Sequence, residues 1–87
     1  MHEMSLIHDL MRKIVTIARD QNAVRVTGVK VRIGALAHIS AGHFREHFVE
    51  EAKGTIADGA RLDVELLSDE SDPQAQDIIL DSVEVED

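Results

Sequence analysis

Alternation of apolar and basic residues is clearest in one stretch of the chain, Val29-Lys30-Val31-Arg32-Ile33-Gly34. Side chains along a strand point alternately to its two faces, so this period of two indicates a strand with one buried face, placed at residues 24–33. The same alternation at residues 60–66 sets alanine, leucine and valine against charged residues. It predicts a second half-buried strand.

Two helices are predicted on either side of the first strand. Apolar residues of segment 4–20 recur every three or four positions, which indicates an amphipathic helix of about four turns. Segment 40–53 shows the same spacing, with Phe44 and Phe48 in its apolar stripe. Ser40 is a suitable N-cap, because its hydroxyl can accept a hydrogen bond from a free backbone N–H, and Gly54 is a suitable C-terminal stop.

The last part of the chain is predicted to be a loop followed by a strand. Residues 68–77 are polar and acidic and contain the only proline, which is typical of a loop. Residues 78–86 are expected to form the strand. Its apolar side chains fall on both faces, with Ile79, Val83 and Val85 on one and Ile78 and Leu80 on the other. The first half of this strand is therefore expected to be covered on both sides.

The order of the elements, α-β-α-β-β, predicts an α+β fold. A strand–helix–strand unit places its two strands parallel, with a right-handed crossover. The last strand can return antiparallel after the acidic loop. We therefore expect two helices packed on one face of a three-stranded mixed sheet, within a single domain of residues 1–87.

Composition excludes several classes of function. The 87 residues include no cysteine, which excludes disulfides, thiolate zinc sites, iron–sulfur clusters and cysteine nucleophiles, and is typical of a cytoplasmic protein. A net charge of -8 and the absence of Trp and Tyr argue against binding to nucleic acid. The apolar runs are short and interrupted by charges, so we expect no membrane span and no signal peptide.

The extreme N-terminus, Met1-His2-Glu3, is the strongest local candidate for chemistry. Because residue 2 is bulky, we expect the initiator Met to be retained. The free α-amine, the first backbone amides and the imidazole of His2 can then converge on one ion, and Glu3 can add an oxygen. Nitrogen ligands in a tetragonal arrangement favour Ni(II) or Cu(II). The alternative is a frayed terminus without a ligand, the usual state of chain ends.

Three further histidines, His38, His43 and His47, fall within ten residues. The spacing of His43 and His47 places two imidazoles on one face of the second predicted helix. A zinc protease motif is excluded, because the first histidine is followed by Phe44 and not by glutamate. The alternative interpretation is that the pair borders the core or faces solvent. No serine, cysteine or phosphate-binding motif supports an enzyme, so we expect none.

Taken in order, several stretches resemble the HypA/HybF nickel metallochaperones of [NiFe]-hydrogenase and urease maturation. They are the opening Met1-His2-Glu3-Met4-Ser5 before a helix, Val29 to Leu36, Phe44-Arg45 with Phe48, Gly54 to Leu62, and the ending Ser82 to Glu86. The resemblance covers residues 1–67 and 78–87.

The resemblance implies a function and a metal site. Members carry Ni(II) at the N-terminal M-H-E sequence and deliver it, with a GTPase partner, to a nickel-enzyme precursor. Carried over, Met1 (through its amine), His2 and Glu3 are the nickel ligands. The family also has a zinc domain with two C-x-x-C pairs between its second and third strands. The acidic loop 68–77 stands in its place here, so no structural zinc is expected.

Two departures from the family pattern concern the nickel site. Ala35 stands where the family usually has glutamate, and Ser40 stands where an acidic residue commonly assists nickel. One interpretation is a rebuilt site, in which the imidazole of His38 replaces the lost carboxylate. The other is a chain that keeps the fold and binds metal weakly or not at all. The intact N-terminal motif favours the first.

We therefore predict a cytoplasmic, nickel-binding accessory protein. Its expected partners are a nickel-enzyme precursor and a maturation GTPase, and the sequence leaves a homodimer open. The alternative is a metal-independent interaction or regulatory module that binds the GTPase or the precursor.

Overall fold

The computed structural model describes residues 2–87, and the side chains from Ser5 onward. Its elements follow the predicted order α-β-α-β-β. They are α1 (His2–Asp20), β1 (Arg25–Ile33), α2 (Ala41–Ala52), β2 (Arg61–Leu66) and β3 (Ile78–Glu86).

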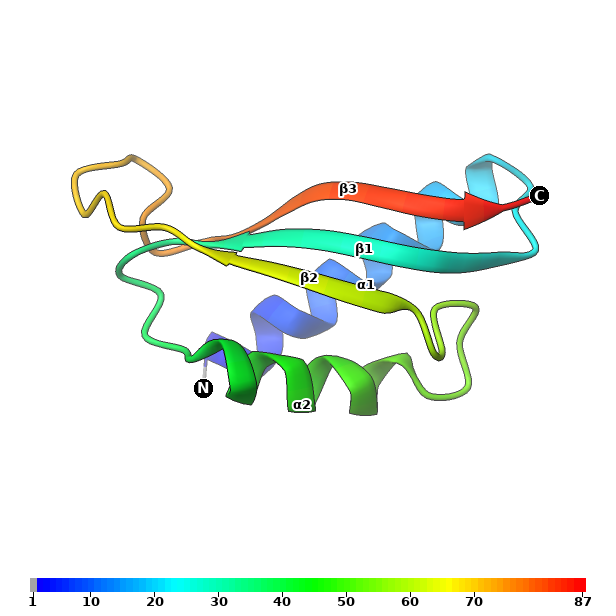
Figure 1. The fold of residues 1–87 in the computed structure, drawn as a ribbon, viewed down its shortest axis with the longest axis horizontal. Coiled ribbons are helices and arrows are strands. Elements are labelled where there is room, and N and C mark those ends of the chain that lie inside the picture. The colour runs from blue at the N-terminus through cyan, green and yellow to red at the C-terminus, as the bar shows by residue number, and fades with distance from the viewer. Residues whose placement is uncertain (1) are drawn as a thin grey trace.

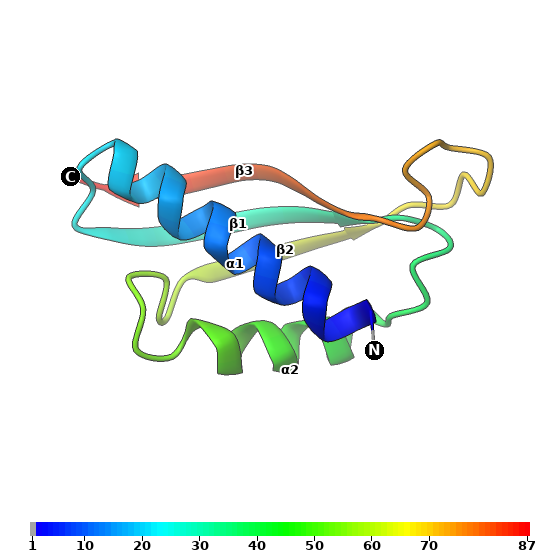
Figure 2. The same cartoon turned by 180° about the vertical axis from the view of Figure 1, so that it is seen from behind.

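The three strands form one mixed sheet in the order β2-β1-β3. β1 is central; it pairs parallel with β2 and antiparallel with β3. Both helices lie on the same side of this sheet, with α1 crossing it and α2 nearer to β2 (Figure 1, Figure 2). The predicted α+β fold is therefore confirmed.

One apolar core lies between the helices and the sheet. Its most deeply buried large side chains come from both helices and from the central strand: Phe44, Phe48, Ile7, Ile14, Ile33, Val26, Val29 and Val31. The opposite face of the sheet carries ion pairs between strands, such as Arg25 with Glu86 at 2.7 Å. This division explains why each strand alternates in sequence between apolar and charged residues.

The predicted facing of β3 is wrong in its first half. Lys30 pairs with Ser82 but Val31 pairs with Leu80, so Asp81 is an extra, unpaired residue of a β-bulge. The bulge reverses the alternation, and Ile78 and Leu80 therefore pack on the same core as Val83 and Val85. Ile79 falls on the other face and is half-buried like Ile78 and Leu80, so the assignment of faces is wrong but both sides of this half of the strand are partly covered.

The predicted cap of α2 is confirmed. The hydroxyl oxygen of Ser40 accepts a hydrogen bond from the backbone N–H of His43 at 3.1 Å. At the other end, Lys53 is the C-cap and Gly54 adopts a φ of +79°. A positive φ is readily adopted only by glycine, which is why the helix ends here.

The acidic segment 68–77 is irregular, as predicted, but it is tied to the rest of the molecule. The N–H of Gly34 donates to the carbonyl of Asp77 at 2.9 Å, and the N–H of Leu36 donates to that of Ala75 at 2.7 Å. Ala75 is buried. This loop therefore packs against the connection between β1 and α2.

Candidate metal centre

The predicted N-terminal ligands lie at the very start of α1. Met1 is outside the described residues, and of His2 and Glu3 the backbone alone is described, as the first residues of α1. The structure thus places the beginning of the helix and leaves the predicted ligand set untested.

The start of α1 lies at the same end of the molecule as the start of α2. Both views show the two helices running in the same general direction from that end (Figure 1, Figure 2). Farther along, Nδ1 of His8 on α1 lies 3.2 Å from a carboxylate oxygen of Glu51 on α2. One turn before His8 is the first turn of α1. One turn before Glu51 is the turn of α2 that contains His47. The first turn of α1 therefore lies towards the part of α2 that contains His47.

His38 belongs to the connection between β1 and α2, two residues before Ser40. Its side chain is exposed and its φ is +59°, a left-handed conformation uncommon for a residue other than glycine but relatively frequent for histidine. It therefore precedes α2 at the end where α1 begins. Among the described residues, however, no group of three His, Asp or Glu side chains is close enough to hold a metal.

Ser40 has a structural role in place of a carboxylate. Its hydroxyl oxygen is engaged with the first turn of α2, while Ala35 supplies no polar group at all. The two positions at which the family pattern has acids thus offer no oxygen ligand from a carboxylate here.

His43 and His47 flank the buried Phe44 and Phe48, as one of the two interpretations expected. His43 is exposed and His47 is half-buried. The Nε2 atoms of the two rings lie 2.8 Å apart. The i, i+4 spacing predicted a shared helix face, but it did not predict that the two nitrogens would meet.

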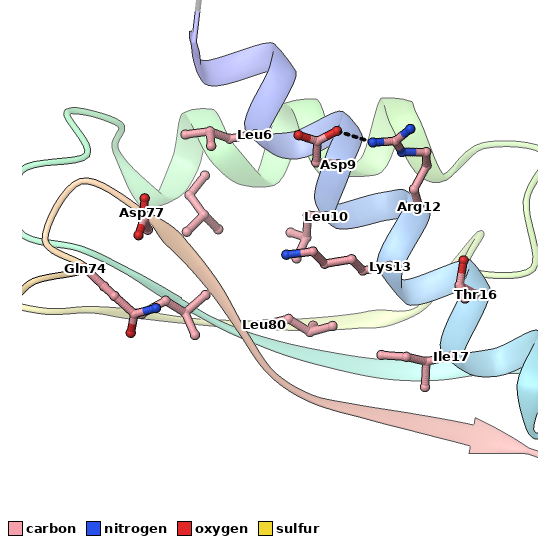
Figure 3. A pocket seen from close by; sticks show the side chains of 12 residues that line it. Leu6, Asp9, Leu10, Arg12, Lys13, Thr16, Ile17, Gln74, Asp77 and Leu80 are labelled. Carbon is pink, nitrogen blue, oxygen red and sulfur yellow. Dashed lines mark hydrogen bonds and ion pairs between the residues drawn. The ribbon is translucent and has the colours of Figure 1, made fainter.

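A groove of about 1020 Å³ lies elsewhere in the described part of the chain. It lies between α1 and the beginning of β3, beside the 68–77 loop (Figure 3). Its polar rim includes Asp9, which pairs with Arg12 at 2.6 Å, and Asp77 on the loop. His38, the predicted ligand whose side chain is described, does not line it. This groove could not be predicted from sequence, because it arises from the packing of segments that are distant in the chain.

The groups with shifted pKa values do not form a catalytic cluster. A hydrogen bond and the positive charge of Lys53 lower the pKa of Glu50, and the pKa of Lys53 is raised in return. Glu84 raises the pKa of Arg61 in the same way, and hydrogen bonds from Ser71 lower that of Asp69. All are exposed surface pairs that need no functional explanation.

Comparison with known proteins gives the family. Residues 1–71 match the family described as "Hydrogenase/urease nickel incorporation, metallochaperone, hypA". The chain belongs to the HypA family. The family is one of metallochaperones, in agreement with the expectation that the chain is not an enzyme.

Curated HypA relatives are similar over about three quarters of this chain. The hydrogenase maturation factor HypA of Archaeoglobus fulgidus is 39% identical over 64 residues, which are 74% of this chain and 58% of that protein. The HypA of Methylocella silvestris is 39% identical over 67 residues, covering 77% and 59% of the two chains. The present chain thus matches somewhat more than half the length of these relatives.

The fold of a solved HypA structure is also similar. The solution structure of the Ni metallochaperone HypA from Helicobacter pylori superposes with a TM-score of 0.79 at 17% sequence identity, covering 97% of each chain. This agreement shows that the HypA fold is shared. Within the part of the chain that the structure describes, no helix is long and apolar enough to cross a membrane.

Proposed function

We propose that this chain is a nickel-binding accessory protein, similar to a metallochaperone, that serves the maturation of a [NiFe]-hydrogenase or another nickel enzyme. The observation that carries this proposal is the Met1-His2-Glu3 sequence in a chain of the HypA family. Nickel is the cargo in this function, so the site must both bind and release it.

The proposed ligands are nitrogen and oxygen atoms of the N-terminus. In a chain that begins at Met1, the α-amine and the imidazole of His2 supply nitrogens, and Glu3 supplies an oxygen. His2 is the essential ligand. His38 is the proposed substitute for the carboxylates missing at Ala35 and Ser40; its place in the connection before α2 supports this role. Imidazole and amine nitrogens suit Ni(II), and no thiolate is available.

The acidic loop 68–77 is proposed to stand where the family has its zinc domain. In support, it joins β2 to β3 directly and is held by hydrogen bonds to Gly34 and Leu36. On this proposal residues 1–87 form a single nickel-binding domain that contains no structural zinc.

The proposed partners are a nickel-enzyme precursor and a maturation GTPase, with the cytoplasm as the compartment. Family membership supports this assignment, because the description of the family names nickel incorporation into hydrogenase and urease. The absence of cysteine from the sequence agrees with a reducing compartment.

Calorimetric titration with Ni(II) tests the N-terminal site. Untagged protein is compared with His2→Ala, and we expect the variant to lose the tighter binding event. Affinity of the unmodified protein should fall steeply below about pH 6, because amine and imidazole nitrogens must lose their protons to bind the ion. Equal binding by the two proteins would refute the proposal.

The absence of carboxylates at Ala35 and Ser40 favours one alternative function. In that case the chain keeps the HypA surface and binds the GTPase or the precursor without carrying metal. A protein that gives no calorimetric response to Ni(II) but still binds the purified maturation GTPase would support this alternative.

A further inference from the structure

The imidazoles of His43 and His47 meet on one face of α2. Their Nε2 atoms lie 2.8 Å apart, while the ring centroids are 4.5 Å apart and the ring planes are inclined by 50°. Because the centroids are farther apart than the nitrogens, the rings approach each other through their Nε2 edges. The contact is a hydrogen bond in which the tautomers decide which nitrogen donates, so both nitrogens lie side by side on one face of the helix, within reach of one ion that replaces the shared proton.

The spacing of these nitrogens fits two neighbouring positions around one metal ion. Imidazole nitrogens bind divalent transition metals at about 2.0–2.1 Å. Two such nitrogens at 90° to each other would be about 2.9 Å apart, whereas tetrahedral ligands would be about 3.3 Å apart. The observed 2.8 Å is the length of a hydrogen bond between the rings, and it is close to the separation that two neighbouring ligands of a square-planar or octahedral ion require.

We propose that His43 and His47 form a second metal site, a two-imidazole site for a divalent transition-metal ion of the Ni(II) or Cu(II) class. The helix beneath it is held firmly. Phe44 and Phe48, which alternate with the two histidines, are buried at 0% and 2% exposure. Ser40 caps the first turn through the backbone N–H of His43. The two ring-bearing positions are therefore fixed relative to each other before any ion binds.

The described residues supply this ion with two protein ligands. Among the described residues, no third His, Asp or Glu completes a metal-binding group with this pair. Water or a ligand from an incoming molecule would fill the remaining positions. A site with two protein ligands on the exposed side of a helix exchanges its ion readily. Such a site is better suited to receiving or transferring a metal ion than to storing one.

The location of the pair links it to the N-terminal motif. His8 of α1 contacts Glu51 of α2, and the first turn of α1 lies one turn before His8. His47 is likewise one turn before Glu51. The assignment of nickel as the natural ion rests on the proposed function, whereas the two-imidazole site itself stands on the geometry of α2.

The test uses the full chain with His2→Ala, which removes the proposed N-terminal site, and Ni(II) as the probe. We expect this protein to bind one Ni(II) ion by calorimetry. Paramagnetic Ni(II) should broaden the imidazole NMR signals of His43 and His47 before those of His8. Adding His47→Ala should weaken binding on the order of a hundredfold, because a linked pair of ligands becomes a single one.

A matched control keeps the number of histidines but changes their spacing. In the His2→Ala background, His47→Ala combined with Glu50→His separates the two imidazoles by seven residues, or about 10.5 Å along the helix. This protein should bind Ni(II) as weakly as His2→Ala/His47→Ala. Circular dichroism confirms that the variants are folded; if one is not, the order of NMR broadening in the His2→Ala protein decides alone.

The outcomes separate this inference from the proposed function. If the unmodified protein and His2→Ala bind Ni(II) alike, the N-terminal proposal fails and the α2 site can still stand. If His2→Ala, its His47→Ala derivative and the spacing control all bind alike, or if the signals of His43 and His47 do not broaden first, the α2 site is refuted.

Discussion

Gly34 lies where the chain leaves β1, with the backbone of the 68–77 loop directly against it. A Cβ atom at this position would lie 2.5 Å from the carbonyl carbon of Ala75 and 2.7 Å from the carbonyl oxygen of Gln74. These are backbone atoms, so they cannot move aside as the end of a flexible side chain would. Glycine is required here for close approach between two segments.

Gly34→Ala should therefore destabilise the protein. We expect the free energy of unfolding to fall by about 1–3 kcal/mol, the usual cost of overpacking. Urea denaturation followed by circular dichroism measures the change. Gly42→Ala is the matched control: apart from its chain neighbours and the backbone of its own helix, no atom of the described residues lies within 4 Å of the added Cβ, and α2 should gain about 0.5 kcal/mol from the better helix former. Equal stabilities of the two variants would contradict this account.

Asp69 is the second residue whose role can be tested by a single change. One of its carboxylate oxygens accepts hydrogen bonds from the hydroxyl of Ser71 at 2.7 Å and from its backbone N–H at 3.0 Å. These bonds lower the pKa of Asp69, the hydroxyl having the larger effect. The resulting stabilisation is present above the pKa of the unfolded chain and is lost as the pH falls through the lower pKa of the folded protein.

Ser71→Ala should raise the pKa of Asp69 part of the way to its ordinary value, because the backbone hydrogen bond remains. Carboxyl carbon NMR signals followed through an acid titration measure this shift. Glu50 lies on α2, away from the 68–77 loop, and Lys53 lowers its pKa. This pKa should be the same in Ser71→Ala as in the unmodified protein. An unchanged pKa for Asp69 would show that the hydroxyl contributes nothing.

At the scale of elements, α2 depends on its cap. Ser40→Ala removes the acceptor for the N–H of His43, and we expect a loss of about 1 kcal/mol in unfolding free energy. Ser40→Asp keeps an acceptor, so its stability should stay within about 0.5 kcal/mol of the unmodified protein. Urea denaturation compares the three proteins; a Ser40→Asp variant as unstable as Ser40→Ala would contradict the capping role.

The same substitution also bears on the proposed nickel site. In the family pattern an acidic residue commonly stands at the position of Ser40, and α2 begins at the end where α1 begins (Figure 2). Ser40→Asp should therefore bind Ni(II) more tightly than the unmodified protein when both are titrated by calorimetry. This gain in Ni(II) affinity should disappear when Ser40→Asp is combined with His2→Ala in one protein.

All five elements could be predicted from sequence, because periodicity and caps are local properties. The alternation around Val31 and the cap at Ser40 are both decided by near neighbours in the chain. The bulge at Asp81 could not be predicted, since it depends on how β3 pairs with Lys30 and Val31 of another strand. The burial of Ala75 was missed for the same reason.

Less of the candidate sites could be predicted. The spacing of His43 and His47 indicated a shared face, whereas the approach of their Nε2 atoms depends on the side-chain conformations of both rings. The importance of the Met1-His2-Glu3 motif came from its chemistry and from family resemblance. Its ligand geometry remains a prediction, because Met1 and the side chains of His2 and Glu3 lie outside the described residues.

At the scale of the whole molecule, the two chain ends are separated along its length. The molecule extends 38 Å along its longest axis, with the start of α1 near one end and the end of β3 near the other (Figure 1). The start of α1 therefore shares its end of the fold with the start of α2, and the end of β3 does not.

This separation predicts that an extension at the N-terminus lowers Ni(II) affinity, whereas an extension at the C-terminus does not. A Gly-Ser extension before Met1 converts the free amine into an amide and displaces it from the motif, so Ni(II) affinity should fall roughly tenfold or more through loss of one ligand of a chelating set. The same dipeptide after Asp87 should leave affinity unchanged, because it is attached beyond β3 at the far end. Calorimetric titration of both proteins beside the unextended chain measures the difference.

In the His2→Ala background the N-terminal extension should have no further effect, since the binding that remains is proposed to belong to His43 and His47. Equal affinities of the N-terminally extended and unextended proteins would show that the amine is not a ligand.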